Sequence, residues 1–280
     1  MKRRIILTGI AATLMAMPAT LAGTAAFAQD GGTMAQVREN GVLRVGVTQA
    51  PPWYSKDPMS GEWSAGVGVS MGQAMADALG VTFEPVEVTW GTAVAALQAN
   101  RIDLMYMLDA TDERRQALDF PDTPLLYYSL AVLARDDLEI TDWADLNKPE
   151  IRISVPQATS MDAFVTANVA DADIQRFPGN SEAIAAFQAG RVDAVTLFHP
   201  PLIAARQRLG SGQIVVPHPV ESRPSSVGLR QEADPAFKEW VDQMIGEYYT
   251  SGQTQEWYEE FLTGFGLDPA TVPPVMRERL

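Results

Sequence analysis

Hydrophobic positions along the chain form short alternating runs and helical stripes that follow one another in turn. Residues 41–49 (GVLRVGVTQ) alternate and are rich in β-branched side chains, which predicts a strand. Residues 66–79 have apolar positions at helical spacing and stop at Gly80, which predicts a helix. The next elements are predicted as a strand over 81–89, a helix over 92–99 and a buried strand over 102–107. This alternation of strands and helices favours a mostly parallel sheet covered by helices.

The second half of the chain repeats this scheme. The elements predicted there are strands over 151–155, 174–177 and 192–198, and helices over 161–169 and 181–189. Residues 213–230 are predicted to return in extended form, and residues 235–262 to be helical. The chain is therefore predicted to form two α/β lobes of like design, with a ligand cleft at the carboxyl ends of their strands.

One motif occurs twice, as AALQANRIDL (95–104) and as AAFQAGRVDA (185–194). Each copy is predicted to be the end of a helix, a short turn and the start of a parallel strand. Asn100 and Gly190 stand where a left-handed helix cap is needed, a conformation that Gly and Asn adopt at low cost. Asp103 and Asp193 are expected to make polar contacts at the turn or strand end and not to carry out chemistry.

The first residues have the features of a cleavable signal peptide. Three basic residues at 2–4 precede an apolar stretch from residue 5 to about residue 26, and Ala26-Phe27-Ala28 has the form of a signal-peptidase site. Residues 1–28 are therefore predicted to be removed and the protein to be exported to the periplasm, with a retained membrane helix as the alternative. The adjacent arginines at 3 and 4 also occur in twin-arginine signals, so the export route stays open.

Composition narrows the classes of function. The formal net charge is -14, which argues against a nucleic-acid partner because such partners require a basic footprint. The chain has no cysteine, so it folds without disulfides and offers no thiol for a lipid anchor. Its two histidines, His199 and His218, lack the spacing of a metal site, and no cofactor or metal is expected.

Several motifs, taken in order, make the chain resemble the periplasmic solute-binding proteins of family 3, the polar amino-acid type of ABC importers. They are GVLRVGV, APPW, the glycine-led helix near Gly66, W-x3-VAALQANRIDL, ATDERRQALDF, VPQATSMDAF, AFQAGRVDAV and SSVGLR. The resemblance implies two lobes joined by two crossover strands near 131–134 and 226–229. It places lobe 1 at 33–132 plus 225–280 and lobe 2 at 133–224.

The resemblance also implies a ligand site. Arg114 matches the family arginine that binds a substrate carboxylate, which suits a planar, bidentate guanidinium. Thr159 and Ser160 match the hydroxyl and backbone contacts of the second lobe, although plain N-capping is an alternative. Trp90 matches the position of a family side chain that packs on the ligand, and Trp53, which follows the diproline, is expected to form another wall of the site. A surface role for Arg114 and a core role for Trp90 are the alternatives, and Tyr54 is either a further wall or a surface residue.

Three positions depart from the family pattern. Asp109 stands where a Ser or Thr is usual, Phe198 replaces the acid that receives the substrate ammonium, and Ala50 replaces an aromatic residue. Either Asp109 takes the ammonium from the opposite lobe, or the ligand has no α-ammonium group; a third interpretation pairs Asp109 with Arg114 in the empty protein. A quaternary amine also fits, since Trp53, Trp90 and Phe198 offer π-faces.

The resemblance implies a monomeric periplasmic receptor that passes a small, polar, carboxylate-bearing solute to the membrane permease of an ABC importer. The solute would be an amino acid or a related amine or betaine. One alternative is an enzyme of the cyclohexadienyl-dehydratase type, with Asp109 or Glu113 as acid or base. Another is an accessory protein of a periplasmic redox enzyme. The tail GLDPATVPPVMRERL (266–280) extends past the usual final helix, as a packed arm or a flexible end.

Overall fold

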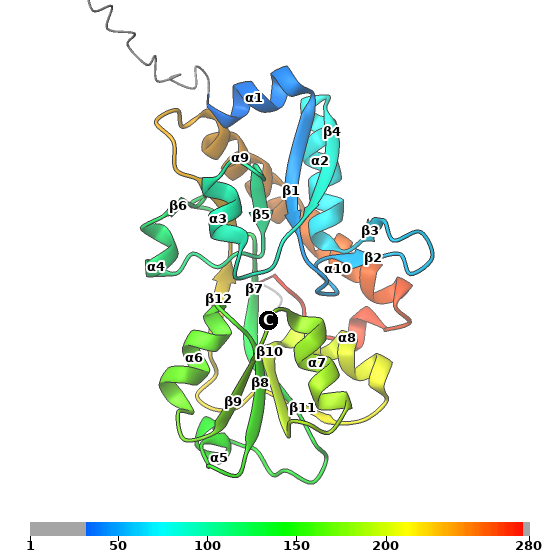
Figure 1. The fold of residues 1–280 in the computed structure, drawn as a ribbon. Helices are drawn as coiled ribbons and strands as arrows, with labels where there is room; N and C mark the ends of the chain where they lie inside the picture. Colours follow the sequence, from blue (N-terminus) through cyan, green and yellow to red (C-terminus); the bar gives the residue numbers. More distant parts are fainter. Residues whose placement is uncertain (1–31, 277–280) are drawn as a thin grey trace, which may run out of the picture. The chain divides into compact units, whose positions relative to one another are not determined.

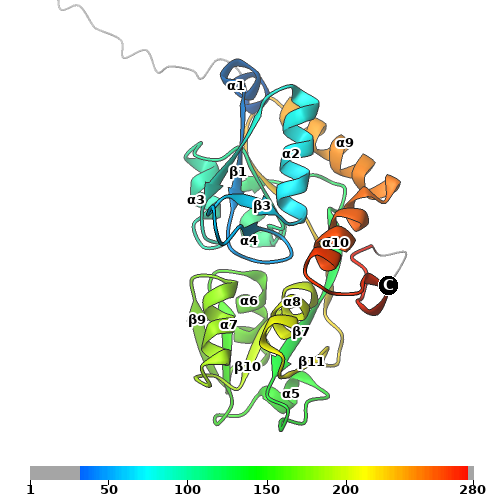
Figure 2. The same cartoon turned by 90° about the vertical axis from the view of Figure 1, so that its right-hand side faces the viewer.

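The computed structural model describes residues 32–276 (Figure 1). The predicted signal peptide over 1–28 and the last residues, 277–280, lie outside the described residues. Within the described part, the chain forms two α/β lobes, each built on its own sheet, as Figures 1 and 2 show. Among these residues, none of the helices has the length and apolar character needed to span a membrane.

The sheet of the first lobe has the strand order β4-β1-β5-β13-β6. Strands β4, β1 and β5 are parallel, whereas β13 runs antiparallel between β5 and β6. The elements of this lobe are α1 (Thr33–Asn40), β1 (Val42–Val47), β2 (Ser55–Lys56), β3 (Trp63–Ala65), α2 (Val67–Leu79), β4 (Thr82–Glu87), α3 (Ala93–Gln98), β5 (Leu104–Tyr106), α4 (Asp112–Arg115), β6 (Leu118–Asp119), β13 (Val227–Arg230), α9 (Ala236–Ser251) and α10 (Gln253–Gly264). The helical region expected over 235–262 is thus two helices, because Gly252 lies between them with φ 87°.

The sheet of the second lobe has the order β11-β7-β10-β8-β9. Strands β10, β8 and β9 are parallel, and β7 runs antiparallel beside β10. The elements of this lobe are β7 (Leu126–Ala134), α5 (Trp143–Leu146), β8 (Arg152–Pro156), α6 (Ser160–Asn168), β9 (Asp173–Phe177), α7 (Asn180–Gln188), β10 (Ala194–Phe198), α8 (His199–Leu209), β11 (Gln213–Val215) and β12 (Ser222–Ser225). In each lobe, three neighbouring parallel strands are therefore followed across the sheet by an antiparallel strand, β13 in the first lobe and β7 in the second.

The repeated motif forms the same corner in both lobes. Asn100 follows α3 with φ 54°, and Gly190 follows α7 with φ 67°, so both adopt the left-handed cap predicted from the sequence. Each corner leads directly into the third parallel strand of its sheet, β5 in the first lobe and β10 in the second.

The two repeated aspartates bind an arginine of the first parallel strand in their own lobe. Asp103 accepts hydrogen bonds from the backbone N–H of Arg44 at 2.7 Å and from its guanidinium at 2.5 and 3.2 Å. Asp193 accepts the equivalent three bonds from Arg152, at 3.0, 2.9 and 2.8 Å. Both aspartates are buried, and their expected structural role at the turn is confirmed.

The lobes are connected by β7 and by β12, which continues into β13. Residues 126–129 of β7 pair antiparallel with β12, and the rest of β7 pairs with β10 and β11 inside the second sheet. Residues 131–134 therefore belong to the second sheet, and the chain crosses earlier, where β7 lies beside β12. Because β7 serves both the crossover and the sheet, the lobe boundaries expected at 132 and 225 stay a prediction.

Candidate functional site

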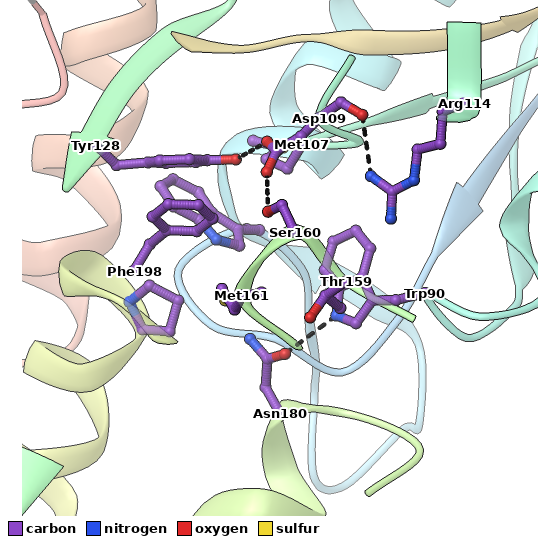
Figure 3. A pocket seen from close by; sticks show the side chains of 12 residues that line it. Trp90, Met107, Asp109, Arg114, Tyr128, Thr159, Ser160, Met161, Asn180 and Phe198 are labelled. Atoms are coloured by element: carbon purple, nitrogen blue, oxygen red, sulfur yellow. Dashed lines mark hydrogen bonds between the residues drawn. The ribbon is translucent and has the colours of Figure 1, made fainter. Parts of the chain in front are cut away.

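A pocket lies between the two sheets, at the carboxyl ends of their parallel strands (Figure 3). Its side chains approach one another closely, so the cavity between them has a volume of only about 20 Å³. Each parallel strand ends in a pocket residue or is followed by one, which is the edge where open α/β sheets bind ligands. All of the expected site residues line it: Trp53, Trp90, Asp109, Arg114, Thr159, Ser160 and Phe198.

Arg114 enters the pocket from the short helix α4, just beyond β5. The Thr111 side chain caps this helix by accepting a hydrogen bond from the Arg114 backbone N–H at 3.2 Å. The guanidinium donates from Nη1 to the Asp109 backbone carbonyl and from Nη2 to the Ala158 carbonyl of the second lobe, both at 3.0 Å. Arg114 is thus buried in the pocket and not on the surface.

Burial and charge act in opposite directions on Arg114. Burial lowers its pKa, and the neighbouring carboxyl of Asp109 opposes that shift. Arginine stays protonated in proteins, so the pocket contains a permanent cation. A buried guanidinium of this kind binds an anionic partner more strongly than one exposed to water.

Asp109 joins the two lobes through its carboxylate. It accepts hydrogen bonds from the hydroxyl of Tyr128 on β7 and from the hydroxyl of Ser160 at the start of α6. Burial raises the pKa of Asp109, while the bonds from Ser160 and Tyr128 and the charge of Arg114 counteract part of the rise. The carboxylate is bound by hydroxyls, and Arg114 contacts Asp109 through the backbone carbonyl and not through the carboxylate. The third interpretation, direct pairing of the two side chains, is therefore wrong for this arrangement.

Thr159 and Ser160 have different roles at the N-terminus of α6: one caps the helix and the other contacts the first lobe. The Thr159 hydroxyl accepts from the Asp162 backbone N–H at 3.1 Å and donates to the Pro156 carbonyl at 2.7 Å, so it caps the helix. The Ser160 hydroxyl instead reaches across the pocket to Asp109. Ala158, just before this cap, has φ 58°, a strained value for a residue with a side chain, and its carbonyl is the one that meets Arg114.

Aromatic rings form one side of the pocket. Phe198 stacks on Tyr128, with ring centroids 3.7 Å apart and an interplanar angle of 27°, and Trp53 lies 6.0 Å from the Tyr128 ring. Where the family resemblance places an acid, the second lobe therefore presents a π-surface. Tyr54 is neither a pocket wall nor a surface residue, because it is fully buried and donates to the Tyr106 carbonyl at 2.9 Å.

Glycine at the start of α2 shapes the loop that holds Trp53. Gly66 has φ 113°, and a Cβ built there would lie 2.5 Å from the Trp53 carbonyl oxygen. The next two backbone N–H groups, of Val67 and Gly68, donate to the carbonyls of Pro52 and Trp53 at 3.0 and 2.9 Å. The helix N-terminus thereby fixes the loop, and a residue with a side chain at position 66 would displace it.

The second lobe also contacts the tip of the first lobe. Trp90 donates its indole N–H to the Asn180 side chain at 3.0 Å, and the Ser181 hydroxyl donates to the Gln49 carbonyl at 3.2 Å. Sequence reasoning missed five pocket residues: Met107, Tyr128, Met161, Asn180 and Pro201. A polar residue at the first position of α7 was the only sequence signal for any of them, and it equally suits a helix start. Residues 32–276 contain no group of acidic, His or Cys side chains that could hold a metal.

Residues 43–264 match the family model of bacterial extracellular solute-binding proteins, family 3. An L-cystine-binding protein of Escherichia coli is 24% identical over 240 residues, which cover 85% of this chain and 88% of that protein. A general L-amino acid-binding periplasmic protein of Rhizobium johnstonii is 26% identical over 254 residues, which cover 86% of this chain and 70% of that protein.

Solved structures agree with the sequence match. A crystal structure of an ancestral amino acid-binding protein, described as a precursor of cyclohexadienyl dehydratase, has a TM-score of 0.74 at 27% identity. It covers 82% of this chain and 99% of that chain. The two-lobed fold predicted from the sequence is confirmed by this likeness. Because the family model spans most of its length, the chain belongs to the bacterial extracellular solute-binding proteins, family 3.

Proposed function

We propose that this protein is the periplasmic receptor of an ABC importer and that it captures a small carboxylate-bearing solute between its lobes. The observation that carries the proposal is Arg114, a buried cation inside the interlobe pocket whose guanidinium reaches the Ala158 carbonyl of the opposite lobe. A ligand carboxylate would take the place of these carbonyl contacts and bind the planar guanidinium through two parallel hydrogen bonds.

The start of α6 supports the same anionic group. This helix begins at Ser160, opposite Arg114, and backbone N–H groups at a helix N-terminus attract negative charge. Asp109 now uses the Ser160 hydroxyl, so a bound carboxylate would compete with Asp109 for it. The pocket thus offers a carboxylate one donor group on each lobe.

The positive end of the ligand would meet Asp109 and the aromatic rings of the second lobe. Among the pocket residues, Asp109 is the one carboxylate and Arg114 the one guanidinium, so a neutral zwitterion balances the charges. Phe198 and Trp53 offer π-faces to an alkylated ammonium, which is attracted to the ring without a hydrogen bond. We therefore propose an amino acid or a related amine or betaine, with alkylated ammonium groups favoured.

Lobe closure is the proposed mechanism of capture. The lobes already meet through the Ser160–Asp109, Arg114–Ala158 and Trp90–Asn180 contacts. A ligand that contacts both lobes adds its own binding free energy to this arrangement and raises its population. The membrane permease would then recognise the closed form. The relatives named for cystine and general L-amino acids support this class of solute.

The location follows from the same proposal. The family is extracellular, and one curated relative is described as periplasmic. Residues 1–28 would direct export and be removed, so that the mature protein begins near Gln29 and works as a monomer. Intact-mass analysis of the exported protein tests this, and retention of residues 1–28 would contradict it.

A thermal-shift screen tests the ligand class. The panel comprises α-amino acids, betaines, small organic acids and, as carboxylate-free controls, polyamines. A ligand present at about 100 times its Kd stabilises the folded state by about 2.7 kcal/mol, which is readily seen. We expect betaines and amino acids to raise the melting temperature and polyamines to leave it unchanged. Stabilisation by polyamines alone would overturn the proposal.

A dehydratase is the second candidate, because one structural neighbour is described as a precursor of cyclohexadienyl dehydratase and Asp109 has a raised pKa suited to an acid. Turnover of a cyclohexadienyl acid, lost in Asp109→Asn, would establish it. A protein that binds no small molecule and co-purifies with a redox enzyme would instead indicate an accessory role.

A further inference from the structure

The chain continues past the family match, and this continuation is packed against the rest of the protein. The family model ends at residue 264, where α10 also ends. Residues 265–276, which we call the C-terminal arm, turn at Gly266 and form a short 3-10 helix, Pro269–Thr271, capped by Asp268. The arm then ends in two buried residues, Val275 and Met276, with 0% and 6% exposure.

One side of the arm contacts the second lobe at α8. The guanidinium of Arg208 lies over the Phe265 ring, 5.2 Å from its centroid, and the Gln207 side chain donates to the Gly266 carbonyl at 3.4 Å. Further along, the Pro273 backbone approaches the ring of His199, whose buried Nε2 has no hydrogen-bond partner among the described residues. The arm therefore touches both ends of α8.

The end of the arm is bound to the crossover and to the first lobe. The backbone N–H of Tyr127, on the part of β7 that pairs with β12, donates to the Val275 carbonyl at 2.8 Å. The Val275 N–H donates to the side chain of Gln255, a buried residue of α10, at 2.9 Å. Figure 2 shows α10 and the red segment that follows it beside β7 and α8, at the level between the two lobes.

We propose that the C-terminal arm is a third connection between the lobes, beside the two crossover strands, and that it favours the closed arrangement. It starts on α10 of the first lobe, crosses α8 of the second, and returns to the strand about which the lobes must move. Opening the pocket must stretch or break at least one of these attachments. The arm thereby shifts the equilibrium between open and closed forms, whatever solute the pocket binds.

The experiment measures the width of the cleft without any ligand. Because the chain has no cysteine, Glu113→Cys and Ala167→Cys give two unique labelling sites. They lie on opposite walls of the groove that leads from the pocket, on α4 and α6. Spin-label distances are compared between the full mature chain, a chain ending at Gly264 and a control ending at Met276.

We expect the chain ending at Gly264 to show a longer label-to-label distance or a new longer population, and the control to match the full chain. Phe265→Ala and Arg208→Ala, which remove one arm contact while leaving Val275 in place, should shift the distribution the same way by a smaller amount. Their double variant should shift it no further than the larger single shift.

Two results of this experiment would contradict the proposed role of the C-terminal arm. An unchanged distance distribution in a folded chain ending at Gly264 would overturn the proposal. If that chain does not fold, unchanged distributions in both point variants would overturn it. Because no solute is used, these results are independent of whether the pocket binds a carboxylate.

Discussion

The two lobes are alike at the turns that lead into their third parallel strands and differ at the pocket, where they face each other. In both lobes an aspartate at the third parallel strand binds an arginine of the first, as Asp103 binds Arg44 and Asp193 binds Arg152. At the opposite ends of the same strands, the first lobe offers Arg114 and Asp109, whereas the second offers the Ser160 hydroxyl and the Phe198 ring.

This contrast separates two kinds of requirement. The turn that joins a helix to a parallel strand makes the same demands in both lobes, so the same residue types recur there. The proposed ligand, with a carboxylate at one end and a cation at the other, would make different demands on the two walls of the pocket, and each wall has its own chemistry. Substitutions at the pocket end of the strands should therefore change ligand binding. Substitutions at the turn end should change the stability of the fold.

The largest effect is expected at the pocket end, for Arg114→Ala. The variant leaves a ligand carboxylate without its guanidinium, so the best ligand of the screen should lose about 2–4 kcal/mol of binding free energy. Its Kd should rise by about 30- to 1,000-fold. Arg114→Lys should also weaken binding, because an ammonium lacks the bidentate fork. Calorimetry measures both, with Arg115→Ala, an exposed neighbour on the same helix, as control. Unchanged affinity in a folded Arg114→Ala protein would remove the residue from the site.

At the other end of the strands, Asp103→Asn and Asp193→Asn should lower stability and spare binding. Each replaces a buried carboxylate that accepts three bonds from one arginine, at a cost of about 1–3 kcal/mol in the free energy of unfolding. Chemical denaturation measures this cost, and Asp137→Asn, at an exposed ion pair with Arg135, should change little. Equal loss of ligand affinity in these variants would erase the contrast between the two ends.

The stabilisation by Asp193 should depend on pH in a defined direction. Hydrogen bonds from Arg152 hold the pKa of Asp193 below its usual value. The stabilisation is therefore present above the unfolded pKa of about 3.9 and is lost as pH falls through the lower folded value. The stability difference between the wild type and Asp193→Asn should shrink on acidification below about pH 4.

Asp109→Asn should change stability with the opposite pH dependence to Asp193→Asn. Burial raises the pKa of Asp109, so its favourable contribution is complete below the unfolded pKa of about 3.9 and is lost as pH rises through the folded value. The variant should therefore melt higher than the wild type at pH 7, with a difference that disappears near pH 4. For a ligand with a cation, it should also lose about 1–2 kcal/mol of affinity. A variant that melts lower at pH 7 would show that the buried carboxylate stabilises the protein.

The smallest effect is expected for Phe198→Leu. The variant keeps an apolar side chain but loses the ring stacked on Tyr128, a contact worth about 0.5–1.5 kcal/mol. Affinity for an alkylated ammonium should fall by a similar amount, whereas affinity for an acid without a cation should not.

Phe198→Asp should improve binding only of α-amino acids, because it supplies a partner for their ammonium. Parallel calorimetry on the three ligand types measures these differences, and an equal loss for all of them would argue against a π contact.

Much of this molecule could be predicted from local sequence patterns. The parallel strands, the helices between them and the two caps at Asn100 and Gly190 follow from hydrophobic period and turn chemistry. The predicted pocket residues come together because they follow strand ends, where the fold gathers side chains that are far apart in the chain. Their role in binding stays a prediction.

The site contacts that the sequence did not indicate depend on pairing between segments that are far apart in the chain. Tyr128 lies in the apolar run LYYSLAVLA, where nothing distinguishes it from its neighbour Tyr127. Its hydroxyl reaches Asp109 and Ser225 only because β7 pairs with β12, a strand from much later in the chain. The direct Asp109–Arg114 pairing was wrong for a similar reason, since both partners found hydrogen bonds on the other lobe or on the crossover.

Trp90 gives the protein a built-in optical signal. Its indole N–H is bonded to Asn180 of the other lobe, and Trp90 as a whole is only 6% exposed. We expect the ring to lose this contact and meet water when the lobes part, which would change the energy of its excited state and the wavelength of its emission. Binding can therefore be followed by the intrinsic fluorescence of unlabelled protein, and a chain with phenylalanine at position 90 identifies the share of the signal that comes from this contact.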